Sequence, residues 1–526
     1  MVTKVFADIV PILLPKWKVP CPQRILMVTD GGLDFGTLGF GFSEFVNFIV
    51  SCGHTVTTAH RGAGVAMISS FKFTPATVPV TLANYDQIWL FGIASGAFGT
   101  PSALPPVEAN VIAAFMQAGG GVFATGDHQT LGQAMGSSLP RIRSMREWAN
   151  VNGGNEFRLD TVVDSGANGT YQFHDQSNKI AQRIYPYFFG NGATSTPHAL
   201  LRHASGAVDF LADHAHESEC YAPTPVAGSF AGVVEWPVNS GGTMVEAAKV
   251  AMSVSAGRYL TDSGKPPVQP RCFLAISAYD GDTANVGRIV CESTWHHYTN
   301  INLNGTGSAN NDLNPGERIG LYTSPGNPTP EYLKIRAYWT NTVNWLAPKN
   351  RRLCWIWMIW NELHFSAEMR EMIKPEKHPA PWNPLLQLGS LAEAALREMY
   401  GPGAMEDLIS NTLDQLDKSD QLRTLLQTGM DLKSEAFKAR SQSSTLMPLQ
   451  DIRRVILGSV LTVMQHQIPA DEAAYATLQK RGRDKFATEL LTQGVRGAET
   501  AIFDYLQDAI KGTSQQFMAL QSRQTK

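Results

Sequence analysis

The sequence predicts an α/β fold: an open, mostly parallel, doubly wound sheet with long insertions, followed by an all-α C-terminal domain. Apolar runs of strand length alternate with helical segments from about residue 20 to about residue 305. Irregular stretches rich in Gly, Pro, Asn and Ser interrupt this alternation, and helix formers dominate after residue 385. The chain has 526 residues. Because one hydrophobic core serves roughly 250 to 300 residues, we expect more than one domain.

The alternation begins with residues 24–30 (RILMVTD), an apolar run that ends in an acidic residue and a glycine-rich turn. Buried parallel strands have this pattern at their carboxyl ends. Residues 42–52 predict a helix that stops at Gly53, and residues 54–60 predict the second strand.

The next unit follows the same order of strand, helix and strand. Residues 86–93 (DQIWLFGI) predict a third buried strand, residues 105–118 a helix with proline at its start, and residues 122–125 the following strand. This alternation of strands and helices predicts a flavodoxin-like doubly wound parallel sheet, whose ligands bind beyond the carboxyl ends of its strands.

The pattern loosens between about residues 130 and 270, which we interpret as long insertions over the carboxyl edge of the sheet. Two runs typical of strands follow, at residues 271–278 and 286–293. Residues 329–345 then predict a helix.

The domain boundaries follow from composition. The α/β domain with its insertions is expected over residues 1–348, and a helix with a linker over residues 349–384. The linker ends in the proline-rich stretch 374–384 (KPEKHPAPWNP). Residues 385–526 lack strand runs and carry leucines at helical spacing, so we expect a helical domain there.

The charge balance excludes several classes of partner. Lys and Arg number 43 and Asp and Glu number 46, which gives a net charge of −3. A nucleic-acid-binding protein typically has an excess of basic residues, and this chain has none. No apolar run reaches the ~20 residues that cross a bilayer. Asp8, Pro11 and Pro15 break the apolar stretch near the start of the chain, so we expect no leader and a cytoplasmic location.

The six cysteines are scattered without a CxxC pair. This spacing argues against a disulfide framework and against a thiolate zinc site. All six are therefore expected to be reduced.

Chemistry is expected first at residues 119–128 (GGGVFATGDH), where a buried strand runs into a tight turn. The turn presents Asp127 and His128 to the ligand crevice of an open sheet, and both are candidate catalytic residues. In the alternative, Asp127 caps a helix that starts near Gln129.

The second candidate is residues 293–300 (STWHHYTN), which follow the late strand. His296 and His297 are candidate catalytic residues there. Adjacent side chains point in different directions, so one His can face the crevice while the other packs. The alternative is a core role for both.

The third candidate is residues 212–219 (ADHAHESE). An HxH spacing puts His214 and His216 on one side of an extended chain. With Glu217 they form a candidate site for a divalent metal ion. A solvated acidic loop is the alternative.

The fourth candidate is the turn after the first strand (TDGGLDFGTLGFG), in which Asp30, Gly31 and Gly32 are candidate substrate-binding residues. Glycines let backbone amides approach a ligand, but the acidic residues would repel a phosphate. The chain also lacks G-x-S-x-G and H-E-x-x-H, which disfavours a serine hydrolase of that type and a zincin.

Together, RILMVTDGG, DQIWLFG, GGGVFATGDH and STWHHY make residues 20–305 similar to the class I glutamine amidotransferase-like superfamily, and within it to the ThuA-like (trehalose utilisation) group. In amidotransferases a nucleophilic Cys stands at the elbow after the GGG strand and a His follows the late strand. Here the corresponding places hold Gly126, Asp127, His128 and the pair His296 and His297. The missing nucleophile argues against a Cys glutaminase.

We therefore expect an enzyme, a hydrolase or a lyase, that uses Asp and His in acid-base or metal-assisted chemistry. The resemblance implies a carbohydrate-related or other small polar substrate. The alternative is a non-catalytic protein that senses a ligand or assembles with partners. In either case the helical domain is a candidate surface for a homo-oligomer or a protein partner.

Overall fold

The computed structural model divides into two compact units. One comprises Cys21–Arg351, and the other comprises Arg352–Lys526 together with Met1–Pro20; we describe each by itself. The structure describes residues 21–94, 104–127, 131–148, 181–189, 195–213, 218–255, 269–306, 320–366, 369, 382–416, 422, 426, 447–468 and 483–524.

The first unit is built on a sheet of eight strands in the order β2-β1-β3-β4-β16-β15-β14-β6. Its strands are β1 (Arg24–Thr29), β2 (Thr55–His60), β3 (Gln87–Phe91), β4 (Gly121–Thr125), β6 (Tyr185–Pro186), β14 (Ala247–Ser255), β15 (Arg271–Tyr279) and β16 (Ile289–Glu292).

The five strands from β2 to β16 are parallel, and their last residues lie side by side. Thr29 pairs with both His60 and Phe91, Phe91 pairs with Thr125, and Thr125 pairs with Glu292. The chain therefore leaves all five strands at one carboxyl edge. β15, β14 and β6 extend the sheet in antiparallel fashion. The expectation of a mostly parallel sheet is confirmed.

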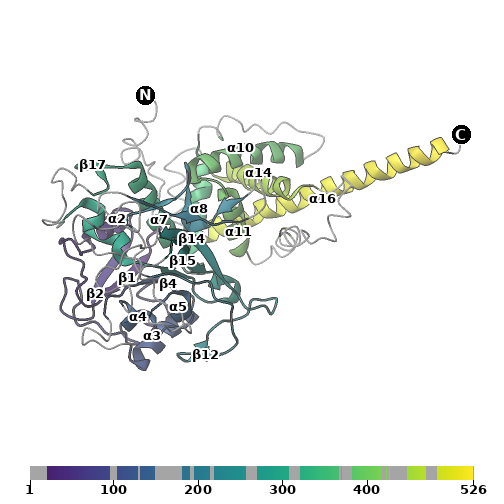
Figure 1. Ribbon diagram of the computed structural model, residues 1–526. Helices are drawn as coiled ribbons and strands as arrows, with labels where there is room; N and C mark the ends of the chain where they lie inside the picture. The colour runs from purple at the N-terminus through teal and green to yellow at the C-terminus, as the bar shows by residue number, and fades with distance from the viewer. Residues whose placement is uncertain are drawn as a thin grey trace. The chain divides into compact units, whose positions relative to one another are not determined.

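Alternation along the central strands decides which helix covers which face. Met27, Trp89 and Phe123 belong to one core cluster, whereas their neighbours Leu26 and Val122 belong to another. The helices α2 (Ser43–Ser51) and α7 (Pro330–Trp345) pack on the first face (Figure 1). The second face packs α3 (Pro106–Gln117), α4 (Gln133–Gly136) and α5 (Ile142–Met145).

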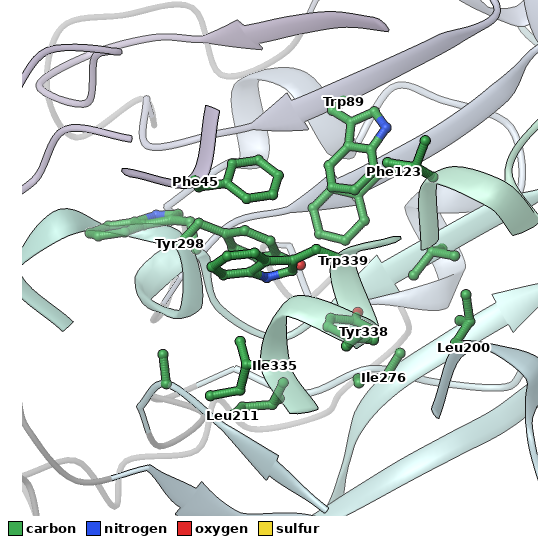
Figure 2. Packing of buried hydrophobic residues seen from close by; sticks show 14 of the residues in the cluster. Phe45, Trp89, Phe123, Leu200, Leu211, Ile276, Tyr298, Ile335, Tyr338 and Trp339 are labelled. Carbon is green, nitrogen blue, oxygen red and sulfur yellow. The ribbon is translucent and has the colours of Figure 1, made fainter. Parts of the chain in front are cut away.

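Aromatic rings fill the first face, as Figure 2 shows. Trp89 stacks on Phe123 with ring centroids 4.6 Å apart, and Phe45 of α2 meets Trp339 of α7 at 5.0 Å and Tyr298 at 4.9 Å. Each such pair stabilises the fold by about 0.5–1.5 kcal/mol beyond the apolar area that it buries. This packing holds the segment that contains Tyr298 against the sheet.

The region expected to be insertions contributes to the sheet itself, because β14 and β6 both lie in it. The remainder of the unit is made of short elements: β5 (Gln182–Arg183), β7 (Phe188–Phe189), β8 (Thr196–Pro197), η3 (Ala199–Leu201), β9 (Arg202–His203), β10 (Gly206–Ala207), β11 (Phe210–Leu211), β12 (Ser229–Phe230), β13 (Val233–Val234), η4 (Gly281–Ala284), η5 (Trp295–Tyr298), α6 (Asn300–Asn304), β17 (Tyr322–Ser324) and β18 (Asn327–Pro328).

The second unit is helical throughout its described residues, as the sequence predicts. Two glycines let its helices approach closely: a Cβ on Gly389 would lie 1.8 Å from the Arg454 carbonyl oxygen, and one on Gly458 would lie 2.0 Å from that of Leu385. Its helices are α8 (Lys349–His364, which starts in the first unit), α10 (Trp382–Tyr400), α11 (Ala404–Asp414), α14 (Leu449–Gln467) and α16 (Arg483–Gln524).

The expected linker falls mainly outside the described residues. Residues 374–381 are not described, and residues 382–384 form the first turn of α10. None of the described helices has the length and apolar character needed to cross a membrane.

The expectation of six reduced cysteines is wrong in the structure. Cys52, Cys220, Cys272 and Cys291 are free thiols, whereas Cys21 and Cys354 are disulfide-bonded. Spacing along the chain could not exclude this, because disulfide formation depends on how tertiary structure places the Cβ atoms.

Candidate functional site

The candidate site lies where β4 and β16 end at the carboxyl edge of the sheet. Gly126 and Asp127 follow β4, and the segment from Ser293 to His296 follows β16. Because the two strands are parallel neighbours with Thr125 opposite Glu292, the chain leaves both of them at the same level. Adjacent strands are about 4.8 Å apart, so the polar side chains of the two turns can meet.

Asp127 and His296 meet as the sequence predicts. The Oδ2 atom of Asp127 lies 3.3 Å from Nε2 of His296. Thr294 supports both residues: its hydroxyl donates to Oδ1 of Asp127 at 2.6 Å and accepts from the His296 backbone N–H at 3.1 Å. The side chain of Asp127 is 1% exposed and that of His296 is 14% exposed, so the imidazole is the part that reaches solvent.

A second carboxylate faces the other nitrogen of the same ring. The Oδ2 atom of Asp213 lies 3.6 Å from Nδ1 of His296. Asn302 fixes this geometry, because its Nδ2 donates to Oδ2 of Asp213 at 2.8 Å and to the His296 carbonyl at 2.9 Å. The imidazole of His296 thus lies between two buried carboxylates. The sequence placed Asp213 in a polar motif but could not pair it with His296.

Aromatic rings set the orientation of His296. Trp295 stacks on it with ring centroids 4.2 Å apart and an interplanar angle of 15°. Phe40, from the loop after β1, meets it edge-on at 6.0 Å and is 50% exposed. The loop that carries Asp30, Gly31 and Gly32 therefore reaches the same part of the edge.

His297 supports the site from inside the fold. Its ring is buried, with Nδ1 in close contact with Oε1 of Glu292 and Nε2 3.0 Å from the Asp213 carbonyl oxygen. Tyr298 and Tyr338 donate to Oε2 of Glu292 at 2.5 and 2.8 Å. Burial, and then the charge of Glu292, raise the pKa of both hydroxyls well above its ordinary value, so both keep donating. His297 thus packs while His296 faces outward.

Arg146 ties the two turns together. Its guanidinium donates to the carbonyl oxygens of Asp127 at 2.9 Å, Ser293 at 2.7 Å and Glu292 at 3.0 Å. Burial lowers the pKa of Arg146, and the cation lies 4.4 Å from the Trp148 ring centre. The sequence does not predict this role of Arg146, because the residues that it joins are far from it in sequence and no local motif marks it.

Asp30 positions the loop that follows β3. Its Oδ1 accepts the backbone N–H groups of Ile93 at 2.7 Å and Ala94 at 2.8 Å. Its Oδ2 is buried and has no hydrogen-bond partner, and burial raises the pKa of this carboxyl. A side chain at Gly31 would meet Ile93, with Cβ 2.3 Å from Cγ2, and φ there is +61°. Two strand spacings separate β1 from β4, so Asp30 and Asp127 stand about 10 Å apart along the edge.

Four of the expected site residues lie outside the described residues: His128 and the three proposed metal ligands His214, His216 and Glu217. Within the part of the chain that the structure describes, no group of three or more His, Cys, Asp or Glu side chains is arranged to hold a metal ion.

Comparisons of this chain with family models, with curated proteins and with solved structures gave no match.

Proposed function

We propose that the chain is an enzyme, a hydrolase or a lyase, that acts on a small polar substrate at the carboxyl edge of its parallel sheet. One observation carries the proposal: His296 lies between the carboxylates of Asp127 and Asp213, at 3.3 and 3.6 Å, and is the most exposed of the three side chains. Such a His can take a proton from water or substrate at one ring nitrogen, which turns from its carboxylate to do so, while the other nitrogen stays paired with the second carboxylate. The flanking carboxylates stabilise the imidazolium that forms.

The roles of the other residues follow from this arrangement. Asp127 and Asp213 orient the ring of His296 and balance its charge, while Thr294 and Asn302 fix the two carboxylates. The His297–Glu292 pair is a positioning element that acts through the Asp213 carbonyl. Catalysis by a positioned acid or base contributes typically 10²–10⁴-fold to a rate.

The strand order supports a ligand crevice at this edge. The order β2-β1-β3-β4-β16 matches the order expected of a flavodoxin-like sheet, in which β2 is added on one side of β1 and β3 on the other. Asp30, Gly31 and Gly32 follow β1 at this point. We assign them to substrate binding, with Gly31 and Gly32 exposed at the edge and the buried Asp30 fixing the neighbouring loop after β3.

The resemblance to the class I amidotransferase-like superfamily and its ThuA-like group belongs to the same proposal. It matches the segment from Gly126 to His128 to the place where a glutaminase has its Cys, and it implies a carbohydrate-related or other small polar substrate. Four further residues are included in the proposal on the basis of the sequence alone: His128, His214, His216 and Glu217. The last three would hold a divalent metal ion whose bound water becomes a nucleophile near neutral pH.

The test uses the purified full chain and a panel of small esters, lactones, glycosides and sugar acids. Asp127→Asn and His296→Gln should lower turnover of any active compound by about 100-fold or more. The matched controls Asp508→Asn and His466→Gln, at exposed positions of α16 and α14, should retain it. Equal turnover in all five proteins, with unchanged circular dichroism, would contradict the proposal.

Burial favours one alternative, a protein that binds a ligand or a partner without turning it over. Asp127 and Thr294 are fully buried and the side chain of His296 is only 14% exposed, and a purely structural network also requires buried, paired groups. Stoichiometric binding of a compound without turnover, lost in Asp30→Ala, would support this alternative. In that case the helical unit is the surface to examine for self-association or a protein partner.

A further inference from the structure

Arg141 is a buried cation on the second face of the sheet, directly before α5. Its side chain is inaccessible to solvent. Its Nη1 donates to the carbonyl oxygens of Val234 at 3.3 Å and Glu235 at 2.6 Å. Its Nε and Nη2 have no hydrogen-bond partner among the residues that the structure describes. Buried guanidinium nitrogens are rarely left without an acceptor, because desolvation of an unpaired donor is costly.

The two unpartnered nitrogens form one edge of the planar guanidinium, the edge that can grip both oxygens of a carboxylate or phosphate. The neighbouring Arg143 uses the same edge in this way: its Nε donates to Oε1 of Glu235 at 2.8 Å and its Nη2 to Oε2 at 3.0 Å. Arg24 does likewise with Asp86, at 3.1 and 2.7 Å. Arg141 presents the same edge with no acceptor against it.

The nearby carboxylates are engaged by other arginines. Glu235 is held by Arg143 and accepts only the backbone N–H of Arg141, at 3.2 Å. Asp280, beyond the end of β15, is held by Arg288 at 2.8 Å. Within the described part of the chain, the guanidinium of Arg141 is therefore buried without a carboxylate in contact, an arrangement that destabilises a fold unless another anion is supplied.

A second unpartnered polar group lies next to it. Tyr279 is buried, and its hydroxyl has no partner in the described ranges. Its ring centre lies 5.2 Å from Cζ of Arg141. Tyr279 pairs with Ile289, the first residue of β16, whereas His296 follows the last residue of that strand. The pair thus lies toward the opposite end of β16 from the candidate active site.

We propose that the Nε–Nη2 edge of Arg141, with the hydroxyl of Tyr279, is a buried binding site for a small oxyanion such as phosphate, sulfate or a carboxylate group. The anion completes the charge balance of this face of the sheet. The site is independent of the proposed activity, so either inference can fail without the other.

Thermal unfolding of the full chain tests the site at constant ionic strength, with chloride exchanged for phosphate, sulfate or acetate. At least one oxyanion should raise the melting temperature of the wild type by about 3 °C or more, since a ligand that binds only the folded state stabilises it. Arg141→Met should abolish this shift and Tyr279→Phe should reduce it. The control Arg143→Met removes a neighbouring cation whose edge is already occupied, and should retain the shift.

Equal shifts in the wild type and Arg141→Met would be a general salt effect and would overturn the proposal. If Arg141→Met does not fold, Tyr279→Phe with an undiminished shift overturns it equally. Crystals grown with selenate give a direct readout. An anomalous peak within hydrogen-bonding distance of Nε and Nη2 is the expected result, and a water molecule there in its place would refute the site.

Discussion

Asp30 is a carboxyl group whose two oxygens have opposite surroundings. Oδ1 accepts two backbone N–H groups, whereas Oδ2 is buried without a partner. Burial is the largest cause of its raised pKa, and it outweighs the two hydrogen bonds and the nearby Arg61, which act in the opposite direction. Ionisation of Asp30 therefore costs the folded protein stability.

Asp30→Asn should remove that cost. Because the folded-state pKa is raised, the folded state binds more protons than the unfolded state as the pH rises above about 4, and the free energy of unfolding falls through this window. Asn keeps an acceptor for Ile93 and Ala94, so the variant should be about 1 kcal/mol more stable at pH 7. Its stability should also fall less with rising pH. Urea unfolding from pH 4 to pH 8 measures both, and a less stable variant at pH 7 would contradict the argument.

At the scale of residues, the sequence predicted which polar side chains meet when they directly follow neighbouring strands. Asp127 and His296 could be placed together because each stands just past an apolar run, and parallel strands end at a common edge. Asp213 and Asn302 could not be paired with His296, since their approach depends on the path of a long irregular segment. His297 was expected in the site, and whether it or His296 would turn inward depended on packing against Glu292.

At the scale of elements, Asn300 joins three pieces of backbone at the candidate site. Its Oδ1 accepts the Glu44 backbone N–H at 2.9 Å in the first turn of α2. Its Nδ2 donates to the carbonyl oxygens of Gly36 at 3.0 Å and Leu38 at 2.8 Å. One amide thus caps α2 and holds the loop that carries Phe40 against the segment after His296.

Asn300→Ala should destabilise the protein by about 1–2 kcal/mol, since the Glu44 N–H loses this acceptor. The Gly36 and Leu38 carbonyls each lose one hydrogen bond and keep the one from the backbone N–H of Ser43 or Gly41. Asn300→Asp keeps the acceptor for the Glu44 N–H and loses the two hydrogen bonds that Nδ2 donates. If the bond to α2 contributes more than those two bonds, this variant should lose less stability than Asn300→Ala. Denaturant unfolding gives both values. A change below about 0.5 kcal/mol for Asn300→Ala would show that the loop holds without this residue.

The elements that the sequence predicted well are buried ones with large apolar side chains. The expected strand at 86–93 appears as β3 (Gln87–Phe91), with every residue buried, and the helix at 105–118 as α3 (Pro106–Gln117). β14 was missed because its nine residues, AAKVAMSVS, are mostly small or polar. Pairing with β15 along its length supplies the stability that its side chains do not.

At the scale of the whole molecule, each unit has its own hydrophobic core. Two clusters cover the faces of the sheet, and a third lies among the helices of the second unit. The sequence predicts a helical domain from residue 385, whereas the second unit begins at Arg352, because buried side chains of α8 belong to its core. The state of the cysteines could not be predicted in the same way, since it depends on contacts between residues distant in sequence.

Thiol counting tests that state for the entire chain. Cys52 and Cys272 are exposed and should react in the native protein. Cys220 and Cys291 are buried, and burial raises the pKa of Cys291 to about 12, so both should react only after unfolding. We therefore expect two reactive thiols in the native protein, four in denaturant without reductant, and six after reduction, because Cys21 and Cys354 are disulfide-bonded. Six thiols in denaturant alone would contradict the disulfide-bonded state of these two residues.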